Sequence, residues 1–532
     1  MHNRARRVIL TALAVAAILF PASAILVLRV WQGEYLPTAE TKLRFRETTL
    51  NFTSVVDLER SLPFMAAAAV DIDGDGRDEL FLGGGRNEPD GIFSFRDGGF
   101  VENPRSAALA KPIPSATHGV AAVDLDDDGR DDLLIAREDG VWLYLSAGEG
   151  EGARRLDLPL PANTTPLSIA LADVNRDGHA DFFISGYIRA DLVEGETIFQ
   201  RPYGGYSSLF INHGDNTWRD ETELWGVLRQ HNTFTALFAD LDNDFDSDLV
   251  IAQDTGRVEM YENRGAPPFV PISNPSINSY PMGIAAGDLD NDGLIDLFFS
   301  NVGQTLPAQM LRGDLRADEP LNTDYMLFEN RGGLSFVDAA ESAGVARLGF
   351  GWGAVAADLD LDGRADLVAA QNYIRLPLNW LMTRYPGKLL LQQPDGAFAR
   401  AEEVSGVANP AFGSTPIIAD FNGDGRPDIV WANIGGPARA FLSSEGTGNA
   451  IRIRLPNTAR ALGAKVEVVS GNLRQTFQVI ANQGLGSDQS RTIIAGVGVR
   501  EMADEVSITL QDGAVLEYRD VPMGAFLRPR LQ

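Results

Sequence analysis

The residues in this sequence that could do chemistry are carboxylates in a nine-residue pattern that occurs seven times. The first copy runs from Asp71 to Glu79, and later copies begin at Asp124, Asp173, Asp240, Asp288, Asp358 and Asp420. Each copy has oxygen-bearing side chains at positions 1, 3, 5 and 9, usually with glycine at position 6, and is flanked by apolar runs. The pattern predicts a calcium-binding loop between two β-strands.

Calcium explains this spacing because it takes about six to eight oxygen ligands at roughly 2.3–2.6 Å. Alternate residues of a tight loop direct carboxylates inward, a backbone carbonyl at position 7 fills a gap, and glycine at position 6 permits a positive φ. A helix-loop-helix calcium site needs glutamate at position 12. Position 12 here is Leu82, Ile135, Ile184, Ile251, Phe299, Ala369 and Trp431.

Two copies depart from the pattern. The fourth has Phe245 in place of glycine, and the third has Asn175 at position 3 with His179 at position 7. A single copy would also suit an acidic turn in a solvated hairpin, but seven copies favour metal binding. We expect the fourth loop to be the weakest site.

Composition narrows the class of protein. The chain has 532 residues, 44% hydrophobic and 22% charged, with a formal net charge of −28. This is a globular composition, and its acidity argues against nucleic-acid binding, which needs a basic face. Cysteine is absent, so a disulfide framework, a thiolate zinc site and a cysteine nucleophile are excluded.

The first residues predict export. Arg4, Arg6 and Arg7 precede an uncharged stretch from Val8 to Leu28, long enough as a helix to cross a bilayer. We interpret residues 1–31 as a signal-anchor with a tether at 32–45; the alternative is a cleaved signal peptide ending near Ala22-Ser23-Ala24. Both place the body outside the cytoplasm, in a periplasmic or extracellular compartment, and an anchor would favour a partner in the membrane.

The elements that must position the loops are short strands. Each unit begins with a small-residue strand, such as Met65–Val70 or Gly283–Ala286, and three more strands follow the loop. Alanine and glycine are weak strand formers, so crowding around an axis is the expected reason for them. Seven four-stranded units predict an all-β fold in which residues 46–446 form a seven-bladed β-propeller.

The last unit lacks a fourth strand before the next domain begins. The segment from Arg44 to Thr53 has strand character and no unit of its own. We therefore predict that it completes the seventh blade and closes the ring without an exposed edge.

The repeats resemble the FG-GAP, or VCBS-type, repeats of integrin α-subunit propellers and exported bacterial proteins. The resemblance depends on the loops, on Phe350-Gly351-Trp352-Gly353, and on Leu209-Phe-Ile-Asn212. It implies calcium as the cofactor, in up to seven loops, with ligands at positions 1, 3, 5, 7 (by its carbonyl) and 9. These are Asp71, Asp73, Asp75, Arg77, Glu79, Asp124, Asp126, Asp128, Arg130, Asp132, Asp173, Asn175, Asp177, His179, Asp181, Asp240, Asp242, Asp244, Asp246, Asp248, Asp288, Asp290, Asp292, Leu294, Asp296, Asp358, Asp360, Asp362, Arg364, Asp366, Asp420, Asn422, Asp424, Arg426 and Asp428.

Residues 449–532 change character, with alternating strands such as Ile451–Leu455 and Lys465–Val469 and no calcium pattern. We expect a small β-sandwich or barrel. This segment is similar to the ASPIC and UnbV module of the cartilage acidic protein family, through Leu462-Gly463-Ala464 and Gly484-Leu-Gly486. The tryptophan-proline that usually precedes its last turn is absent, because Leu510-Gln511 stands there.

Three insertions interrupt the units after their second strands, at Tyr187–Tyr206, Gly303–Asp324 and Asn372–Gly387. All should emerge on the face opposite the calcium loops. Aromatic residues with arginines are typical of binding surfaces, although the insertions could merely cap the channel. The residues concerned are Arg189, Arg201, Arg312, Arg316, Arg375, Arg384, Tyr187, Phe199, Tyr203, Trp380 and Tyr385.

No serine elbow, phosphate loop or zinc His-Glu-x-x-His occurs in the sequence. His118 and His231 precede first strands at similar points, and Arg312-Gly313-Asp314 matches a short adhesion tripeptide, which we attribute to chance. We expect a non-enzymatic, membrane-anchored scaffold that binds a protein partner, such as a membrane complex. The alternatives are a lectin-like glycan-binding propeller and a polysaccharide-active enzyme.

Overall fold

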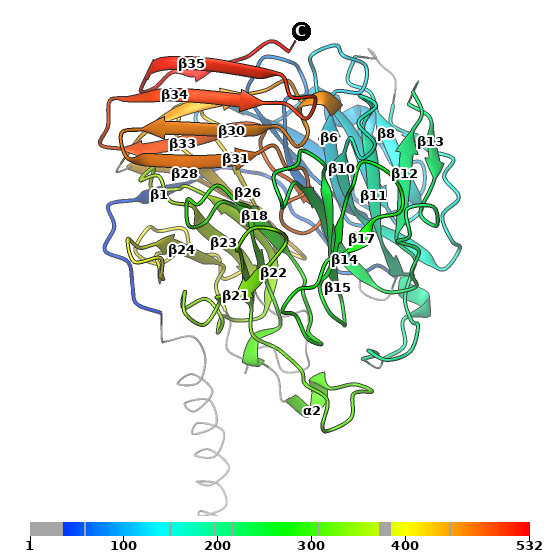
Figure 1. The fold of residues 1–532 in the computed structure, drawn as a ribbon. Helices are drawn as coiled ribbons and strands as arrows, with labels where there is room; N and C mark the ends of the chain where they lie inside the picture. The colour runs from blue at the N-terminus through cyan, green and yellow to red at the C-terminus, as the bar shows by residue number, and fades with distance from the viewer. Residues whose placement is uncertain are drawn as a thin grey trace, which may run out of the picture.

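The computed structural model describes residues 36–531 except 58–59, 148–151, 196, 215, 306–307, 372–384 and 446–447. The described chain is almost entirely β-strand, as predicted (Figure 1). Its helical pieces are one short α-helix, α2 (Ala308–Leu311), and the 3₁₀ turns η1 (Pro104–Leu109), η2 (Ala190–Leu192), η3 (Gly303–Thr305) and η4 (Ala459–Ala461).

Seven antiparallel sheets follow one another along the chain, each with four strands of its own. Their strands are β2 (Ala67–Val70), β3 (Glu79–Leu82), β4 (Gly91–Arg96), β5 (Gly99–Glu102); β6 (Thr117–Val123), β7 (Asp132–Arg137), β8 (Gly140–Tyr144), β9 (Arg154–Arg155); β10 (Thr164–Ala172), β11 (Asp181–Ile188), β12 (Ser208–Asn212), β13 (Trp218–Asp220); β14 (Thr233–Ala239), β15 (Asp248–Gln253), β16 (Glu259–Glu262), β17 (Val270–Pro271); β18 (Ile284–Gly287), β19 (Asp296–Phe299), β20 (Met326–Asn330), β21 (Phe336–Asp338); β22 (Gly351–Ala357), β23 (Asp366–Gln371), β24 (Lys388–Gln392), β25 (Phe398–Arg400); and β26 (Gly413–Ala419), β27 (Asp428–Asn433), β28 (Arg439–Glu445) with β1 (Arg44–Thr48).

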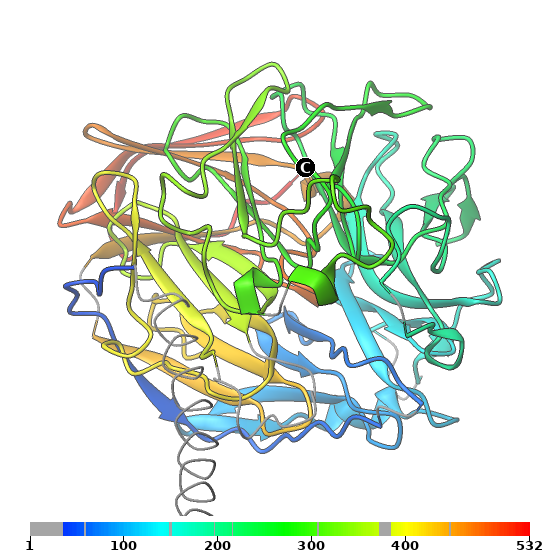
Figure 2. The same ribbon diagram turned by 90° about the horizontal axis from the view of Figure 1, so that it is seen from below.

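The arrangement is propeller-like, and Figure 2 shows the sheets around a common centre. The first strands of consecutive sheets contact one another, and β26 of the last sheet contacts β2 of the first. The predicted closure is confirmed, because β1 pairs antiparallel with β28, with Phe45 opposite Ser443 and Thr48 opposite Ala440. The N-terminal strand therefore supplies the missing fourth strand of the last sheet.

Crowding at the centre explains the small residues of the first strands. A Cβ atom on Gly119 would lie 2.2 Å from the carbonyl oxygen of Leu167 in the next sheet, and one on Gly283 would lie 2.5 Å from that of Trp352. Neither distance allows a side chain, so glycine is required where neighbouring first strands approach most closely.

The C-terminal segment forms two further sheets around a core of its own, as predicted for a small sandwich. One sheet contains β33 (Thr492–Gly498), β29 (Asn449–Arg454) and β36 (Phe526–Leu527); the other contains β31 (Leu473–Gln478), β30 (Lys465–Ser470), β34 (Met502–Thr509) and β35 (Val515–Pro522). Ile451, Val466 and Val506 are buried between the two sheets. In Figure 1 this domain lies across the end of the molecule opposite α2.

A segment of the C-terminal domain, residues 479–491, lies along the first strands of the surrounding sheets. The backbones of Gly484 and Ile284 exchange hydrogen bonds of 2.8 and 3.2 Å, and β32 (Ser487–Asp488) pairs with β2. Leu485 belongs to the same buried cluster as Phe64 and Trp352. This centre is therefore filled with side chains.

The predicted anchor from Val8 to Leu28 lies outside the described residues. Among residues that the structure describes, no helix is long and apolar enough to cross a membrane.

Candidate metal centres

The seven nine-residue loops connect the first and second strands of the seven sheets. In each sheet position 9 begins the second strand, as Asp181 begins β11 and pairs with Ala172 at the end of β10. Five loops bring three carboxylates together so that one oxygen from each lies within 4.8 Å of the others. These groups are Asp71/Asp73/Glu79, Asp124/Asp126/Asp132, Asp240/Asp242/Asp248, Asp288/Asp290/Asp296 and Asp358/Asp360/Asp366.

Backbone N–H groups hold the first and last carboxylates of each loop in place. In the fifth loop Asp288 accepts hydrogen bonds from the N–H groups of Asp292 (2.9 Å) and Gly293 (3.0 Å). Asp296 accepts from Leu289 (2.9 Å) within the loop and from Asn330 (2.8 Å) on the third strand. The chain thus orients these carboxylates before any ligand arrives.

The third and seventh loops have asparagine at position 3, so they offer fewer carboxylates. Their geometry is the same: Asp173 accepts from the N–H of Gly178 at 2.9 Å, and Asp420 accepts from that of Gly425 at 2.8 Å. The side-chain oxygens of Asn175 and Asn422 can still serve as neutral ligands.

The fourth loop keeps this geometry despite Phe245. The N–H of Phe245 donates to Asp240 at 2.9 Å, as the glycine N–H does elsewhere, but its φ is +70°. Left-handed backbone is unfavourable for a bulky residue. The local strain at Phe245 is consistent with the prediction that this loop is the weakest site, and the binding strength itself remains a prediction.

Position 4 is also left-handed in all seven loops, which sequence reasoning missed. Only the first and seventh loops have glycine there, with φ of +76° at both Gly74 and Gly423. The other five place Asp127, Arg176, Asn243, Asn291 and Leu361 at φ of +57° to +63°. Asparagine and aspartate tolerate this conformation, but arginine and leucine gave no signal of it.

The electrostatics of the loops favour a cation. Burial is the main cause that raises the pKa of Glu79, Asp181, Asp248 and Asp296 to about 8, with nearby carboxylates of the same loop adding to it. The Oδ1 atoms of Asp71, Asp242 and Asp420 are buried and make no hydrogen bond within the described structure. Buried carboxylate oxygens of this kind fit a hard divalent cation that prefers oxygen ligands.

Side chains outside the pattern link neighbouring loops, and sequence reasoning missed them. At the end of the third strand, Asn263 donates to the carbonyl of Val174 in the preceding sheet's loop at 2.8 Å. Asn330 does the same with Leu241 at 2.7 Å. An asparagine at the end of the third strand was the available signal, although its distance from the loop varies with the insertions. These bonds join the third loop to the fourth sheet and the fourth loop to the fifth sheet.

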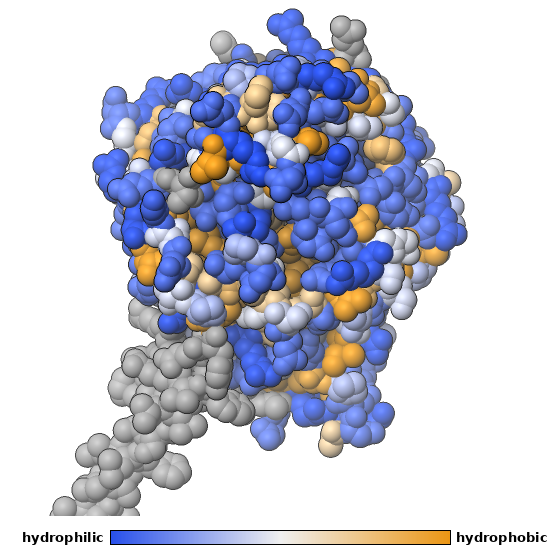
Figure 3. All heavy atoms as spheres, turned by 60° about the vertical axis from the view of Figure 1, so that its left-hand side comes forward, coloured by the Kyte–Doolittle hydropathy of each residue, from blue (hydrophilic) through white to orange (hydrophobic). Residues whose placement is uncertain are grey.

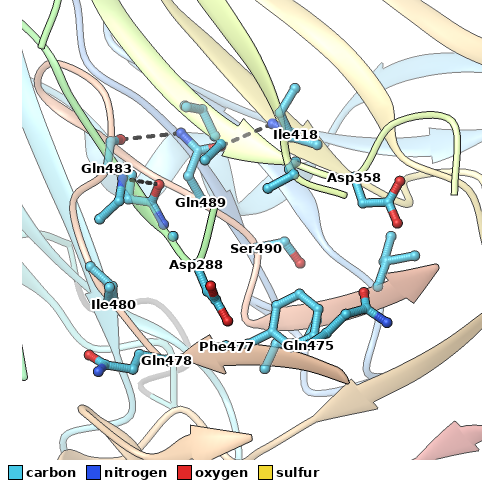
Figure 4. A pocket seen from close by; sticks show the side chains of 18 of the residues that line it. Asp288, Asp358, Ile418, Gln475, Phe477, Gln478, Ile480, Gln483, Gln489 and Ser490 are labelled. Carbon is cyan, nitrogen blue, oxygen red and sulfur yellow. Dashed lines mark hydrogen bonds between the residues drawn. The ribbon is translucent and has the colours of Figure 1, made fainter. Parts of the chain in front are cut away.

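The C-terminal domain lies on the loops. Arg452 pairs with Asp420 of the seventh loop (N···O 2.9 Å), and Gln478 exchanges hydrogen bonds with the backbone of Asp240 at 3.0 and 2.7 Å. Between this domain and the fifth and sixth loops lies a cavity of about 160 Å³. Figure 4 shows Asp288 and Asp358 among the residues that line it, together with Gln475 and Phe477 of β31.

The insertions emerge at the opposite end of the sheets, as expected. In the third sheet Thr164 pairs with Ile188 at that end, while Ala172 pairs with Asp181 at the loop end. Two insertions meet there, because Asp314 accepts from the N–H groups of Phe199 and Gln200 at 2.6 and 3.1 Å. Asp314 of the adhesion-like tripeptide therefore has a structural role.

The aromatic residues of the insertions lie partly inside the protein, which favours the alternative that the insertions cap the centre. Tyr187 is partly buried and donates to Asp254, and burial raises its pKa; Tyr385 is buried against Gly349. Phe199 packs against Tyr280, and both Phe199 and Tyr187 pack against the central cluster that contains Trp352. A role of these residues in binding a partner stays a prediction. Arg375, Trp380 and Arg384 lie outside the described residues.

The predicted arginines find partners near them in sequence. Arg189 pairs with Asp191, Arg201 with Glu194, and Arg316 with Glu319. Arg312 donates to two backbone carbonyls of its own insertion. The N–H of Glu194 donates to the hydroxyl of Tyr203 at 2.6 Å.

Comparisons with known proteins match both parts of the chain. A family model described as an FG-GAP-like repeat matches residues 71–135, 124–184 and 240–299, an FG-GAP repeat model matches 412–449, and an ASPIC and UnbV model matches 455–528. Cartilage acidic protein 1 from Homo sapiens is 27% identical over 410 residues, covering 68% of this chain and 58% of its own length. The Xenopus tropicalis protein is 27% identical over 391 residues, covering 65% and 56%. The chain thus spans less than two thirds of these relatives.

Matches among solved structures are more distant. A crystal structure of BBS1N in complex with ARL6DN has a TM-score of 0.43 at 8% identity, covering 75% of this chain and 97% of that chain. The V. cholerae biofilm matrix protein Bap1 has a TM-score of 0.34 at 14% identity, covering 90% and 62%.

Proposed function

Because the chain carries FG-GAP-like repeats followed by an ASPIC and UnbV domain, we propose that it is a calcium-binding, seven-bladed β-propeller that acts outside the cytoplasm as a protein-interaction scaffold. The seven sheets, the ring of contacts between their first strands and the pairing of β1 with β28 support the blade number. Residues 46–446 would be the propeller, and β1 begins two residues before this range, at Arg44.

The observation that carries the calcium assignment is the grouping of three carboxylates in each of five loops, with buried oxygens that lack a hydrogen bond. A bound calcium ion would provide the positive charge that these buried carboxylates lack. The ligands would be the side chains at positions 1, 3, 5 and 9 and the carbonyl at position 7. Loops of this kind commonly bind calcium at about 10⁻⁴ to 10⁻³ M outside cells, so a structural role is expected.

The interaction surface would be the face that carries the insertions, since the C-terminal domain covers much of the loop face and residues 479–491 fill the centre. Leu192, Val193 and Met310 expose 45%, 49% and 63% of their surface on the insertions. Exposed apolar residues on rigidly supported loops suit a protein partner. The face seen in Figure 3 is largely hydrophilic with scattered apolar patches, consistent with a net charge of −28.

We propose a non-enzymatic role, because metal binding would account for the carboxylates of the loops. The stretch from Val8 to Leu28 would anchor the protein, so that the partner is in or on the same membrane.

The calcium assignment is tested by metal analysis of the purified chain after dialysis against calcium. We expect up to seven calcium ions per chain and a lower unfolding temperature after chelation, restored by calcium. Asp296→Asn should lose one ion, whereas Asp395→Asn, in an exposed turn between β24 and β25, should lose none. Unchanged stability and no bound metal would remove the calcium assignment.

The interaction role is tested separately by gentle detergent extraction of the native membrane and affinity isolation with and without a chelator. A stoichiometric membrane protein that is lost on chelation supports the scaffold role. A monodisperse chain without a partner contradicts it and directs attention to glycans.

A further inference from the structure

A second cavity lies at the end of the sheets opposite the metal loops, with a volume of about 590 Å³. It is bordered by the beginnings of β6 and β10, the turn between β7 and β8, and part of the first insertion. Thr117 pairs with Arg137 at this end, while Val123 pairs with Asp132 at the loop end. The cavity is therefore separate from the calcium loops, and its size is typical of a site for a small molecule.

The floor of the cavity contains a buried histidine. His118 is only 1% exposed, and neither of its ring nitrogens makes a hydrogen bond of regular geometry. The backbone carbonyls of Leu62 and Pro166 are the acceptors that the chain offers to the ring, and the ring meets the edge of Phe64. Buried polar side chains are nearly always hydrogen-bonded, so a ligand oxygen of better geometry would compete with these carbonyls for the ring N–H.

An excess of positive charge lies behind the floor. Lys111 and Arg137 share one carboxylate, Asp90, at 3.0 and 2.7 Å, and all three side chains are at most 6% exposed. The Nε and Nη1 atoms of Arg137 make no hydrogen bond in the described structure. Two buried cations thus face one anion, although the guanidinium also lies over Trp142 at 4.9 Å.

The rim adds four arginines. Arg86 pairs with Glu138 at 2.7 Å and Arg189 with Asp191 at 2.9 Å. Arg60 and Arg155 have no carboxylate within 4.0 Å among the described residues.

The third carboxylate of the rim, Asp139, accepts hydrogen bonds from Ser115 at 2.7 Å and from the indole of Trp142 at 3.3 Å. Arg155 lies across Gly140, where a Cβ atom would be 2.7 Å from its Nε. The rim and the buried trio behind it therefore hold six basic side chains against four carboxylates, on a chain whose net charge is −28.

We propose that this cavity binds the carboxylate or sulfate group of a small ligand, paired with Arg155 and Arg60 and contacted by the N–H of His118. Bidentate pairing of guanidinium with an oxyanion is strong and specific. Leu62, Ile113 and Leu160 provide apolar surface for the rest of the ligand. The inference rests on the proposed binding role of this face, and it does not depend on the calcium loops.

The test is calorimetric titration of the calcium-loaded full chain with sodium sulfate, sodium glutarate and a sulfated disaccharide, at ionic strength held constant with sodium chloride. We expect at least one probe to bind with a stoichiometry of one. Arg155→Gln should weaken that binding at least tenfold, as loss of one charged contact would. Arg474→Gln is the matched control, since this arginine is 61% exposed on the C-terminal domain, and it should change binding less than twofold.

A spectroscopic readout locates the ligand. With ¹⁵N-labelled histidine, saturation should shift the His118 ring signals and leave those of His213 unchanged. Tighter binding of the disaccharide than of sulfate would identify a sugar as the source of the anion; tighter binding of glutarate would identify a carboxylic acid. Absence of saturable binding up to about 10 mM of every probe, or equal weakening by Arg474→Gln, would overturn the proposal. Neither result tests whether the chain binds a membrane protein, so the anion-binding proposal and the scaffold proposal can be refuted independently.

Discussion

Arg454 of the C-terminal domain and Asp78 of the first metal loop form an ion pair, with Nη1 2.7 Å from Oδ1. Their side chains are only 9% and 4% exposed, and the same guanidinium lies 3.4 Å from Asp71, the first candidate ligand of that loop. Asp131 of the second loop accepts from Asn457 of the same domain at 2.9 Å. The C-terminal domain is thus fixed to the repeat array at the candidate metal sites.

Replacing Arg454 with methionine should destabilise the chain by about 3–5 kcal/mol, because Asp78 would keep a buried charge without its partner. Urea denaturation at fixed calcium measures the change. Arg519→Met is the control, since Arg519 is 67% exposed and its ion pairs should contribute less than about 1 kcal/mol. Equal effects of the two substitutions would contradict the buried role of Arg454.

Replacing Phe245 with glycine should strengthen the fourth loop. The φ of +70° is unfavourable for phenylalanine by about 1–2 kcal/mol, and glycine removes that cost at the expense of some unfolded-state entropy. A net gain of up to about 1 kcal/mol is expected, together with tighter calcium binding at one site, measured by calcium titration. Phe245→Ala retains the backbone strain and should give no gain. A weaker site in the glycine variant would refute this account.

The sequence predicted the structure best where the spacing of one residue type has a single physical explanation. The spacing of carboxylates from Asp71 onward predicted where the loops would lie, and the absence of a fourth strand after β28 predicted the role of Arg44–Thr48. The first prediction depends on a local pattern, and the second follows from counting the strands of each unit. Gly119 of β6 and Gly283, just before β18, also had a steric reason that the structure confirms.

Contacts between residues far apart in the sequence could not be predicted, because no local pattern indicates them. Arg454 and Asp78 are 376 residues apart, and nothing near either residue indicated the other. Tyr187 was grouped with residues typical of a binding surface because it begins an insertion, but it is half-buried and its hydroxyl donates to Asp254, just after β15 of the next sheet. The left-handed φ of Leu361 was equally hidden, since leucine does not indicate such a turn.

The stability of the protein should fall with acidity between about pH 6.5 and pH 4 through His118. Burial lowers the pKa of this histidine from 6.5 to about 4 in the folded protein, so the unfolded chain binds the proton more readily. The contribution is fully present above pH 6.5 and is lost as pH falls toward 4, up to about 3 kcal/mol.

Denaturation at saturating calcium across this range, for the native chain and for His118→Gln, isolates the effect. The difference in unfolding free energy between the two proteins should decrease as pH falls. His231, whose pKa is also lowered to about 4 by burial, is present in both proteins and cancels. A difference that does not vary with pH would show that His118 titrates normally.

Removing the N-terminal strand should open the ring. β1 pairs with β28 over five residues, and the segment before and within it buries Leu36, Leu43 and Phe45, so a variant lacking residues 1–48 loses a strand ladder and part of two cores. At about 1 kcal/mol for each hydrogen bond and about 2 for each of these three side chains, the loss should exceed about 6 kcal/mol. The free edge of β28 should then pair with other chains, because unprotected strand edges promote association. Light scattering after size-exclusion chromatography and urea denaturation measure the two effects.

A variant lacking residues 1–35 keeps β1 and should remain monomeric with unchanged stability. If the shorter variant is also monomeric and unfolds at the same urea concentration, β1 does not close the ring in solution.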